Sequence, residues 1–191
     1  WIVGIVNALN WLDGIDGLAI GITIIINFSF LIFIFSKADF SLFILICSTL
    51  GASLAFLRFN SFPSKILMGD GGSYFLGINI ALFSLAIFNS SHNNMQYELF
   101  KNEILTPFLI MALPILDSIR VCINRIKRGY SPFFPDRSHI HHKLIEYGFS
   151  EEKKINIIYF ISLLLSFIAM FINKISIQGI ITFFLTLIIL R

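Results

Sequence analysis

The chain has 191 residues, of which 57% are hydrophobic and 13% are charged, and its mean hydropathy is +0.85. A water-soluble domain carries about 25% charged residues, so this composition excludes a globule whose whole surface faces water. The net charge of +3 is too small to indicate nucleic-acid binding. The chain is therefore expected to be an all-α membrane protein, with residues 1–191 forming one polytopic transmembrane domain.

Six apolar runs follow a partial helix at residues 1–12. Each approaches the roughly 20 residues that a helix needs to cross a bilayer. Helices are expected because backbone groups in the bilayer must satisfy their hydrogen bonds internally. The predicted full spans are Leu18–Phe35, Leu42–Leu57, Tyr74–Phe88, Ile104–Ile123, Ile155–Ile172 and Ile177–Leu190.

The fourteen basic residues are distributed unevenly between the connections. Lys37, Lys101 and Lys174 lie in connections on one side of the predicted membrane, and the other eleven lie on the opposite side. The positive-inside rule predicts that the side with eleven basic residues is cytoplasmic. Span parity places three polar segments on that side, at residues 1–17, 58–73 and 124–154.

The first polar segment contains Asn7, Asn10 and Asp13 at intervals of three residues, followed by Asp16. On a helix, the first three fall along one side. Carboxylate and amide oxygens are suited to Mg²⁺ or to ribose hydroxyls, so this segment predicts a ligand site. A polar helix cap with two Asp-Gly turns is the alternative interpretation.

The second polar segment ends with Gly69-Asp70-Gly71-Gly72-Ser73 at the start of a predicted span. Glycines let backbone N–H groups approach a phosphate, and a helix N-terminus favours an anion. Asp70 would then hold a cation that bridges to that phosphate. The alternative is a helix start capped by Asp70 or Ser73.

The third polar segment brings Arg137 close to His139, His141 and His142. The guanidinium fork matches the geometry of phosphate, so an anionic ligand is favoured. Zinc binding by the histidines is one alternative, and binding of the basic segment to lipid headgroups is another.

Asp117 and Arg120 are ionisable residues within a predicted span, one helical turn apart, and a structural ion pair is expected there. A transporter fragment would need ionisable residues deep in several spans. An intramembrane zinc hydrolase would need ligands at bilayer depth, whereas the three clustered histidines lie in a predicted connection.

The three polar segments, in this order, resemble the polyprenyl-phosphate N-acetylhexosamine-1-phosphate transferases (glycosyltransferase family 4). The first two motifs are Asn7-Ala-Leu-Asn10-Trp-Leu-Asp13-Gly-Ile-Asp16-Gly and Met68-Gly-Asp70-Gly-Gly-Ser73. The third is Pro135-Asp136-Arg137-Ser-His139-Ile-His141-His142, and its Asp-Arg-x-His-x-His-His form is similar to the undecaprenyl-phosphate GlcNAc-1-phosphate branch. Pro114-Ile-Leu-Asp117 also matches the family.

The resemblance implies transfer of an N-acetylhexosamine-1-phosphate from a UDP-sugar to undecaprenyl phosphate, with release of UMP. The reaction would use Mg²⁺, with Mn²⁺ as an alternative, at the cytoplasmic face of a bacterial plasma membrane. It would begin the assembly of a cell-envelope polysaccharide. A homodimer is left open.

The resemblance also implies roles for individual residues. Asp70 and Asn10 would be the metal ligands. The implied catalytic residues are Asp70, Asp13, Asp16, His139, His141 and His142. The implied substrate-binding residues are Asn7, Asn10, Gly71, Ser73 and Arg137.

The chain departs from the family pattern at two points. Family members carry an Asp-Asp motif on earlier helices that this sequence lacks, so we expect a C-terminal portion that is inactive by itself. Ser138 stands where glycine or a larger apolar residue is expected, so the sugar stays open. The phospho-MurNAc-pentapeptide translocase activity of a related branch is the alternative.

Overall fold

The computed structural model describes residues 1–35, 39–90, 105–134, 138–146 and 148–172. Within these ranges the regular structure is helical, without any strand, as the composition predicted. The helices are α1 (Ile2–Leu12), α2 (Leu18–Phe35), α3 (Phe40–Asn60), α4 (Gly69–Ser90), α6 (Ala112–Lys127), α7 (Ile140–Glu146) and α8 (Glu151–Ile172).

Four helices in the described ranges are long and apolar enough to cross a membrane: α2, α3, α4 and α8. They correspond to the first, second, third and fifth predicted spans. The third begins five residues earlier than predicted, at Gly69 rather than Tyr74, so Asp70 lies in the first turn of α4. The sixth predicted span, Ile177–Leu190, lies outside the described residues, so a total of six full spans is not confirmed.

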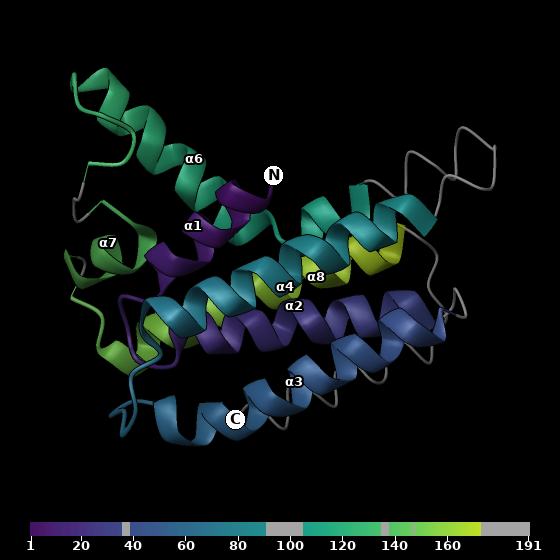
Figure 1. The fold of residues 1–191 in the computed structure, drawn as a ribbon. Helices are drawn as coiled ribbons and strands as arrows, with labels where there is room; N and C mark the ends of the chain where they lie inside the picture. Colours follow the sequence, from purple (N-terminus) through teal and green to yellow (C-terminus); the bar gives the residue numbers. More distant parts are fainter. Residues whose placement is uncertain (36–38, 91–104, 135–137, 147, 173–191) are drawn as a thin grey trace.

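The fourth predicted span differs from the expectation of one continuous apolar helix. Residues 105–110 are helical, a turn follows at Met111, and α6 then runs away from the other long helices (Figure 1). Pro114 explains a break at this point, because proline has no N–H to donate to the carbonyl one turn earlier. α6 buries one face that includes Leu113, Asp117, Val121 and Arg125, and is therefore amphipathic.

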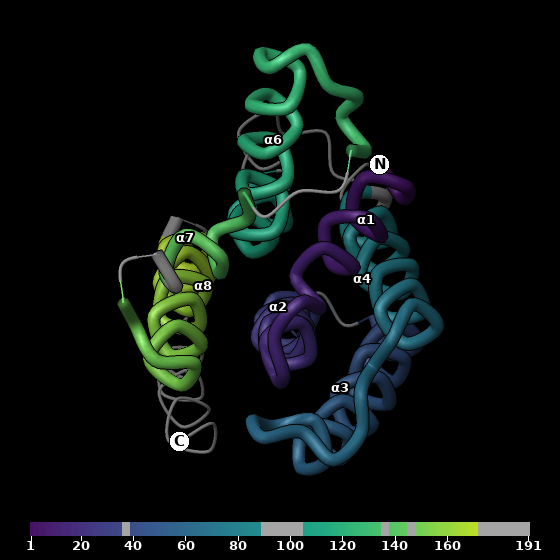
Figure 2. Tube along the Cα trace, turned by 90° about the vertical axis from the view of Figure 1, so that its left-hand side faces the viewer, coloured from purple at the N-terminus to yellow at the C-terminus, as the bar shows by residue number. Residues whose placement is uncertain are grey.

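The long helix α2 occupies the middle of the bundle, with α3, α4 and α8 around it (Figure 2). In the apolar span of α2, 78% of the residues are buried within the protein, whereas in that of α3 only 22% are. This difference follows from position, because a helix that is apolar all round must be covered by protein or by lipid. Ile44, Leu45 and Leu54 of α3 are exposed apolar side chains suited to contact with acyl chains.

The polar ends of the helices meet at one end of the bundle. The end of α1, the loop between α3 and α4, and α7 all lie on the left in Figure 1. Hydrogen bonds join the first two motifs, and His141 of α7 contacts Gly14. Segments as far apart in sequence as Gly14 and His141 thus form one polar region.

Candidate active site

A cleft of about 370 Å³ opens at the polar end of the bundle. It contains three carboxylates, Asp13, Asp16 and Asp70, and we call it the acidic cleft. Its lining residues are Asn10, Asp13, Gly14, Ile15, Asp16, Asn60, Leu67, Met68, Gly69 and Asp70. The first two sequence motifs therefore form one site.

The first motif is held by contacts around Gly17. α1 ends at Leu12, and the chain turns into α2 through Gly17, whose φ of +79° favours glycine. The Gly17 N–H donates to Asn60 Oδ1 at 3.1 Å, and the Tyr159 hydroxyl donates to the Gly17 carbonyl at 2.6 Å. Helices α3 and α8 thus fix the loop that carries Asp13 and Asp16.

Asp16 joins this loop to the connection between α3 and α4. Its Oδ2 accepts the Ser64 N–H at 2.9 Å. Asn60 Nδ2 donates to the Ile66 carbonyl at 2.9 Å and shapes the same connection. One oxygen of Asp16 is therefore engaged by the fold, and the side chain still lines the cleft.

The second motif meets the first through Asn10. Asn10 Nδ2 donates to Asp70 Oδ1 at 2.9 Å and to Ser73 Oγ at 3.0 Å. α1 and α4 can approach closely because a Cβ at Gly77 would lie 2.8 Å from Val6 Cα. The structure thus brings together Asn10 and Asp70, the two predicted metal ligands.

Among the described residues, the wall of the acidic cleft contains three carboxylates and no Lys or Arg. Burial raises the pKa of Asp13 to about 6; the Gly69 N–H partly opposes this shift, while the charges of Asp70 and Asp16 add to it. In the described part of the chain, no Lys or Arg forms an ion pair with these three carboxylates. Such a site is suited to a cation.

The donor set fits a hard divalent cation that keeps several water ligands. Mg²⁺ is commonly held by one or two carboxylates plus water and substrate phosphate, and Mn²⁺ accepts similar oxygen ligands. The Asn10–Asp70 hydrogen bond leaves Asn10 Oδ1 and Asp70 Oδ2 for a metal. Among the described residues, no group of three or more His, Cys, Asp or Glu side chains could hold a metal ion by itself.

The third motif packs against the wall of the cleft through His141, which lies beside Gly14. His141 is 1% exposed, and neither ring nitrogen has a hydrogen-bond partner among the described residues. A Cβ on Gly14, in the cleft wall, would lie 2.9 Å from His141 Nε2, so glycine leaves room for the imidazole. Burial lowers the pKa of His141 to about 4, with a further contribution from His142, so the ring is neutral near pH 7.

The neighbouring histidines have different surroundings. His142 is partly exposed, and its ring centroid lies 4.2 Å from that of His141. His139 Nδ1 lies 2.9 Å from Asp117 Oδ2, so Asp117 serves more than the predicted ion pair with Arg120. That ion pair is confirmed, with 2.6 Å between Arg120 Nη2 and Asp117 Oδ1. Arg137 lies outside the described residues, so its predicted role stays a prediction.

Three predicted substrate-binding residues are not in the wall of the acidic cleft. Asn7 donates from Nδ2 to the Val3 carbonyl at 2.8 Å. Ser73 is buried and accepts from Asn10, so it supports the predicted metal-ligand pair. Gly71 is exposed in the first turn of α4.

Comparison with known proteins covers the residues of this site. The sequence profile of glycosyl transferase family 4 matches residues 1–88, which carry both motifs of the acidic cleft. A relative in Bacillus subtilis is 36% identical over 177 residues, or 93% of this chain and 48% of the relative; it is named a probable undecaprenyl-phosphate N-acetylglucosaminyl 1-phosphate transferase. The chain belongs to glycosyl transferase family 4.

Other members of family 4 differ in the sugar that their names state. A phospho-N-acetylmuramoyl-pentapeptide-transferase of Clostridioides difficile is 33% identical over 88% of this chain and 48% of its own length. An undecaprenyl-phosphate alpha-N-acetylglucosaminyl 1-phosphate transferase of Escherichia coli K12 is 29% identical over 78% of this chain and 40% of its own length. The chain spans about half the length of the relatives it matches.

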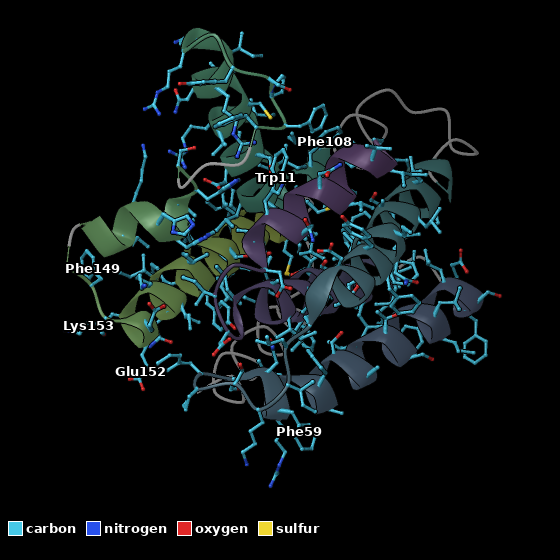
Figure 3. All side chains as sticks on the ribbon, turned by 60° about the vertical axis from the view of Figure 1, so that its left-hand side comes forward. Trp11, Phe59, Phe108, Phe149, Glu152 and Lys153 are labelled. Carbon is cyan, nitrogen blue, oxygen red and sulfur yellow. The ribbon has the colours of Figure 1, made fainter. Side chains whose placement is uncertain are left out.

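Several residues that shape this family 4 site were missed by sequence reasoning. Asn60 and Tyr159 fix Gly17, and the Tyr159 hydroxyl occupies space that a Cβ on Gly21 would fill. Trp11 lies beside α6 in Figure 3, with its ring 5.5 Å from that of His139. An asparagine just beyond the predicted span Leu42–Leu57 and a glycine within the span Leu18–Phe35 were the available signals, but neither identifies its partner.

Proposed function

We propose that this chain builds the active site of a Mg²⁺-dependent sugar-phosphate transferase. In the proposed reaction, an oxygen of undecaprenyl phosphate attacks the β-phosphorus of UDP-N-acetylglucosamine. A bond forms between these atoms, the bond from the β-phosphorus to the bridging oxygen breaks, and UMP leaves. The product is the lipid-diphosphate sugar that begins assembly of an envelope polysaccharide.

The acidic cleft carries this proposal. Three carboxylates converge beside a helix start and, among the described residues, no Lys or Arg pairs with them. A sugar nucleotide is itself anionic, so such a cleft can receive its diphosphate when a cation neutralises the charge. Bound Mg²⁺ would supply that neutralisation and polarise the reacting phosphate.

The residues of the cleft would have different roles in the proposed reaction. Asn10 Oδ1 and Asp70 Oδ2 would hold the cation, while Ser73 fixes the Asn10 amide. Asp13 and Asp16 would face the nucleotide and the metal-bound water. Asp13, with its raised pKa, could also accept a proton.

His141 and His142 would bind the phosphate or the sugar beside Gly14, together with Arg137 from the same motif. The unpartnered nitrogens of His141 support this assignment, because a buried polar atom normally has a partner. Asn7 and Gly71 remain proposed substrate contacts at the rim.

Transfer of phospho-N-acetylmuramoyl-pentapeptide is the second candidate. The Clostridioides difficile relative favours it, because its identity to this chain is close to that of the Bacillus subtilis relative. The form of the third motif favours N-acetylglucosamine.

A donor assay distinguishes the two candidates. The full-length natural protein in lipid nanodiscs is supplied with undecaprenyl phosphate, MgCl₂ and either UDP-N-acetylglucosamine or UDP-N-acetylmuramoyl-pentapeptide. We expect UMP release and a lipid-linked product with the first donor, lost with EDTA or without the lipid. Product from the second donor alone would select the alternative, and no product from either by a folded protein would reject the function.

We further propose that the polar end faces the cytoplasm at a bacterial plasma membrane. Single cysteines at two exposed positions test this: Ser41 near the start of α3, and Ser131 beyond α6. An impermeant maleimide added to intact cells should label position 41 and not position 131. Labelling of position 131 alone would reverse the orientation.

A further inference from the structure

Asp117 binds the histidine segment, residues 138–142, to α6 through hydrogen bonds. The Asp117 side chain is buried, and its Oδ2 lies 2.9 Å from His139 Nδ1. Its Oδ1 accepts the Ile140 N–H at 3.0 Å and Arg120 Nη2 at 2.6 Å. Arg120 also donates to the Ser138 carbonyl at 2.8 Å. One carboxylate therefore orients the start of α7.

Arg125 holds the opposite side of the same imidazole. It is 3% exposed, and its Nη2 lies 3.4 Å from His139 Nε2. Its Nη1 donates to the Pro132 carbonyl at 2.6 Å, and the guanidinium carbon lies 5.1 Å from the centre of the Trp11 ring. Arg125 thus joins α6, the connection to α7, and α1.

These contacts determine which nitrogen of His139 carries the proton. A carboxylate paired with arginine accepts hydrogen bonds, so His139 Nδ1 must donate to Asp117. A guanidinium has no acceptor, so His139 Nε2 must accept from Arg125. The geometry therefore places a proton of His139 on Nδ1, toward Asp117, and both nitrogens are engaged by the fold.

His141 has the opposite character, although it is two residues away. Its ring is nearly parallel to that of His139, at 7° and 5.9 Å between centroids, and packs against Gly14. In the part of the chain that the structure describes, its two nitrogens have no hydrogen-bond partner. Fixing His139 and the Ile140 N–H thus also fixes where His141 meets the cleft.

We propose that Asp117 and Arg125 are positioning residues that act through His139 to hold His141 at the acidic cleft. His139, which sequence analysis grouped with the catalytic residues, then belongs to the positioning network. The kinetic part of this inference rests on the proposed transferase function. The tautomer of His139 does not depend on it.

The tautomer is tested by nitrogen NMR of the full-length protein labelled with ¹⁵N-histidine. The His139 signals are assigned by their loss in a His139 substitution. We expect His139 to show a protonated Nδ1 and an unprotonated Nε2, and Asp117→Asn to change that pattern. The matched control is Asp39→Asn, which alters a carboxylate that caps α3 far from the site. A proton on Nε2 of His139 in the unaltered protein would overturn the proposal, whatever the enzyme's activity.

The kinetic test is a double-mutant cycle. Substitution of a residue that orients a functional side chain typically lowers activity by about 10- to 100-fold. We therefore expect Asp117→Asn to lower kcat within that range. In a His141→Ala background, the same substitution should change kcat by less than about twofold, because its effect passes through His141. Arg125→Lys should behave in the same way. Equal fold-losses in both backgrounds, with melting temperatures unchanged, would refute the positioning role.

Discussion

The acidic cleft and the histidine segment are in contact at Gly14, yet their carboxylates differ in whether they are paired within the protein. The carboxylates Asp13, Asp16 and Asp70 converge and, in the described ranges, lack an ion-pair partner. The carboxylate of Asp117, by contrast, is matched by Arg120 and by the Nδ1 of His139. A carboxylate without a cationic partner in the protein indicates where an external cation would bind. A buried carboxylate that is paired within the protein indicates a structural role.

The largest expected effect comes from removing one charge from the unmatched side. Asp70→Asn should lower turnover of the full-length protein by about 10³-fold or more, because a metal contact used in the transition state is lost. The measurement is UMP release at limiting Mg²⁺. Asp39→Asn is the matched control, since asparagine also caps a helix. Near-normal turnover of Asp70→Asn would contradict the metal assignment.

Removing the unpartnered imidazole should have the next largest effect. His141→Ala should lower kcat by about 10²-fold, as expected for loss of a positioned polar group. Elemental analysis of the same samples separates this role from zinc binding. Loss of one zinc per chain in His141→Ala would show that the histidine segment is a metal site, and the contrast with the acidic cleft would disappear.

The two regions should also differ in their response to acid. The pKa of His141 falls from 6.5 to about 4 on burial, so the undocked segment binds a proton more readily. Docking of α7 is thus fully favoured above pH 6.5 and weakens as the pH falls toward 4, by roughly 3 kcal/mol at the limit. Hydrogen exchange of α7 amides should therefore accelerate, after correction for intrinsic rates, between pH 6.5 and 4. His141→Asn should remove this dependence; an unchanged profile would show that another group is responsible.

A smaller effect is expected where α1 packs on α4 to pair Asn10 with Asp70. Gly77→Ala places a Cβ 2.8 Å from Val6 Cα, and such overpacking typically costs about 1–3 kcal/mol. The melting temperature in detergent should fall. Gly51→Ala in α3 is the control, because its Cβ would meet no atom within 4 Å. Equal melting temperatures for the two variants would mean that the close approach at Gly77 is not needed.

Sequence reasoning predicted the long helices well because each signal is contained within its own segment. Uninterrupted apolar runs define α2 and α8 wherever their neighbours lie. The fourth predicted span was less accurate, because hydropathy does not register the helix break at Met111 that Pro114 explains. The spacing of Asn10 and Asp13 placed both on one side of α1, and both line the cleft.

The sequence by itself determined which residues carry polar chemistry and on which helix ends they lie, since these follow from local composition and helical periodicity. The tertiary structure decided their partners. Asn10 bonds to Asp70 sixty residues away, and Tyr159 bonds to Gly17 across 142 residues. His139 and His141 are two residues apart in one motif, yet His139 has both nitrogens engaged, and His141 has no partner among the described residues. The physical reason is that a hydrogen bond needs its donor and acceptor within about 3 Å, and the packing of separate helices sets that distance.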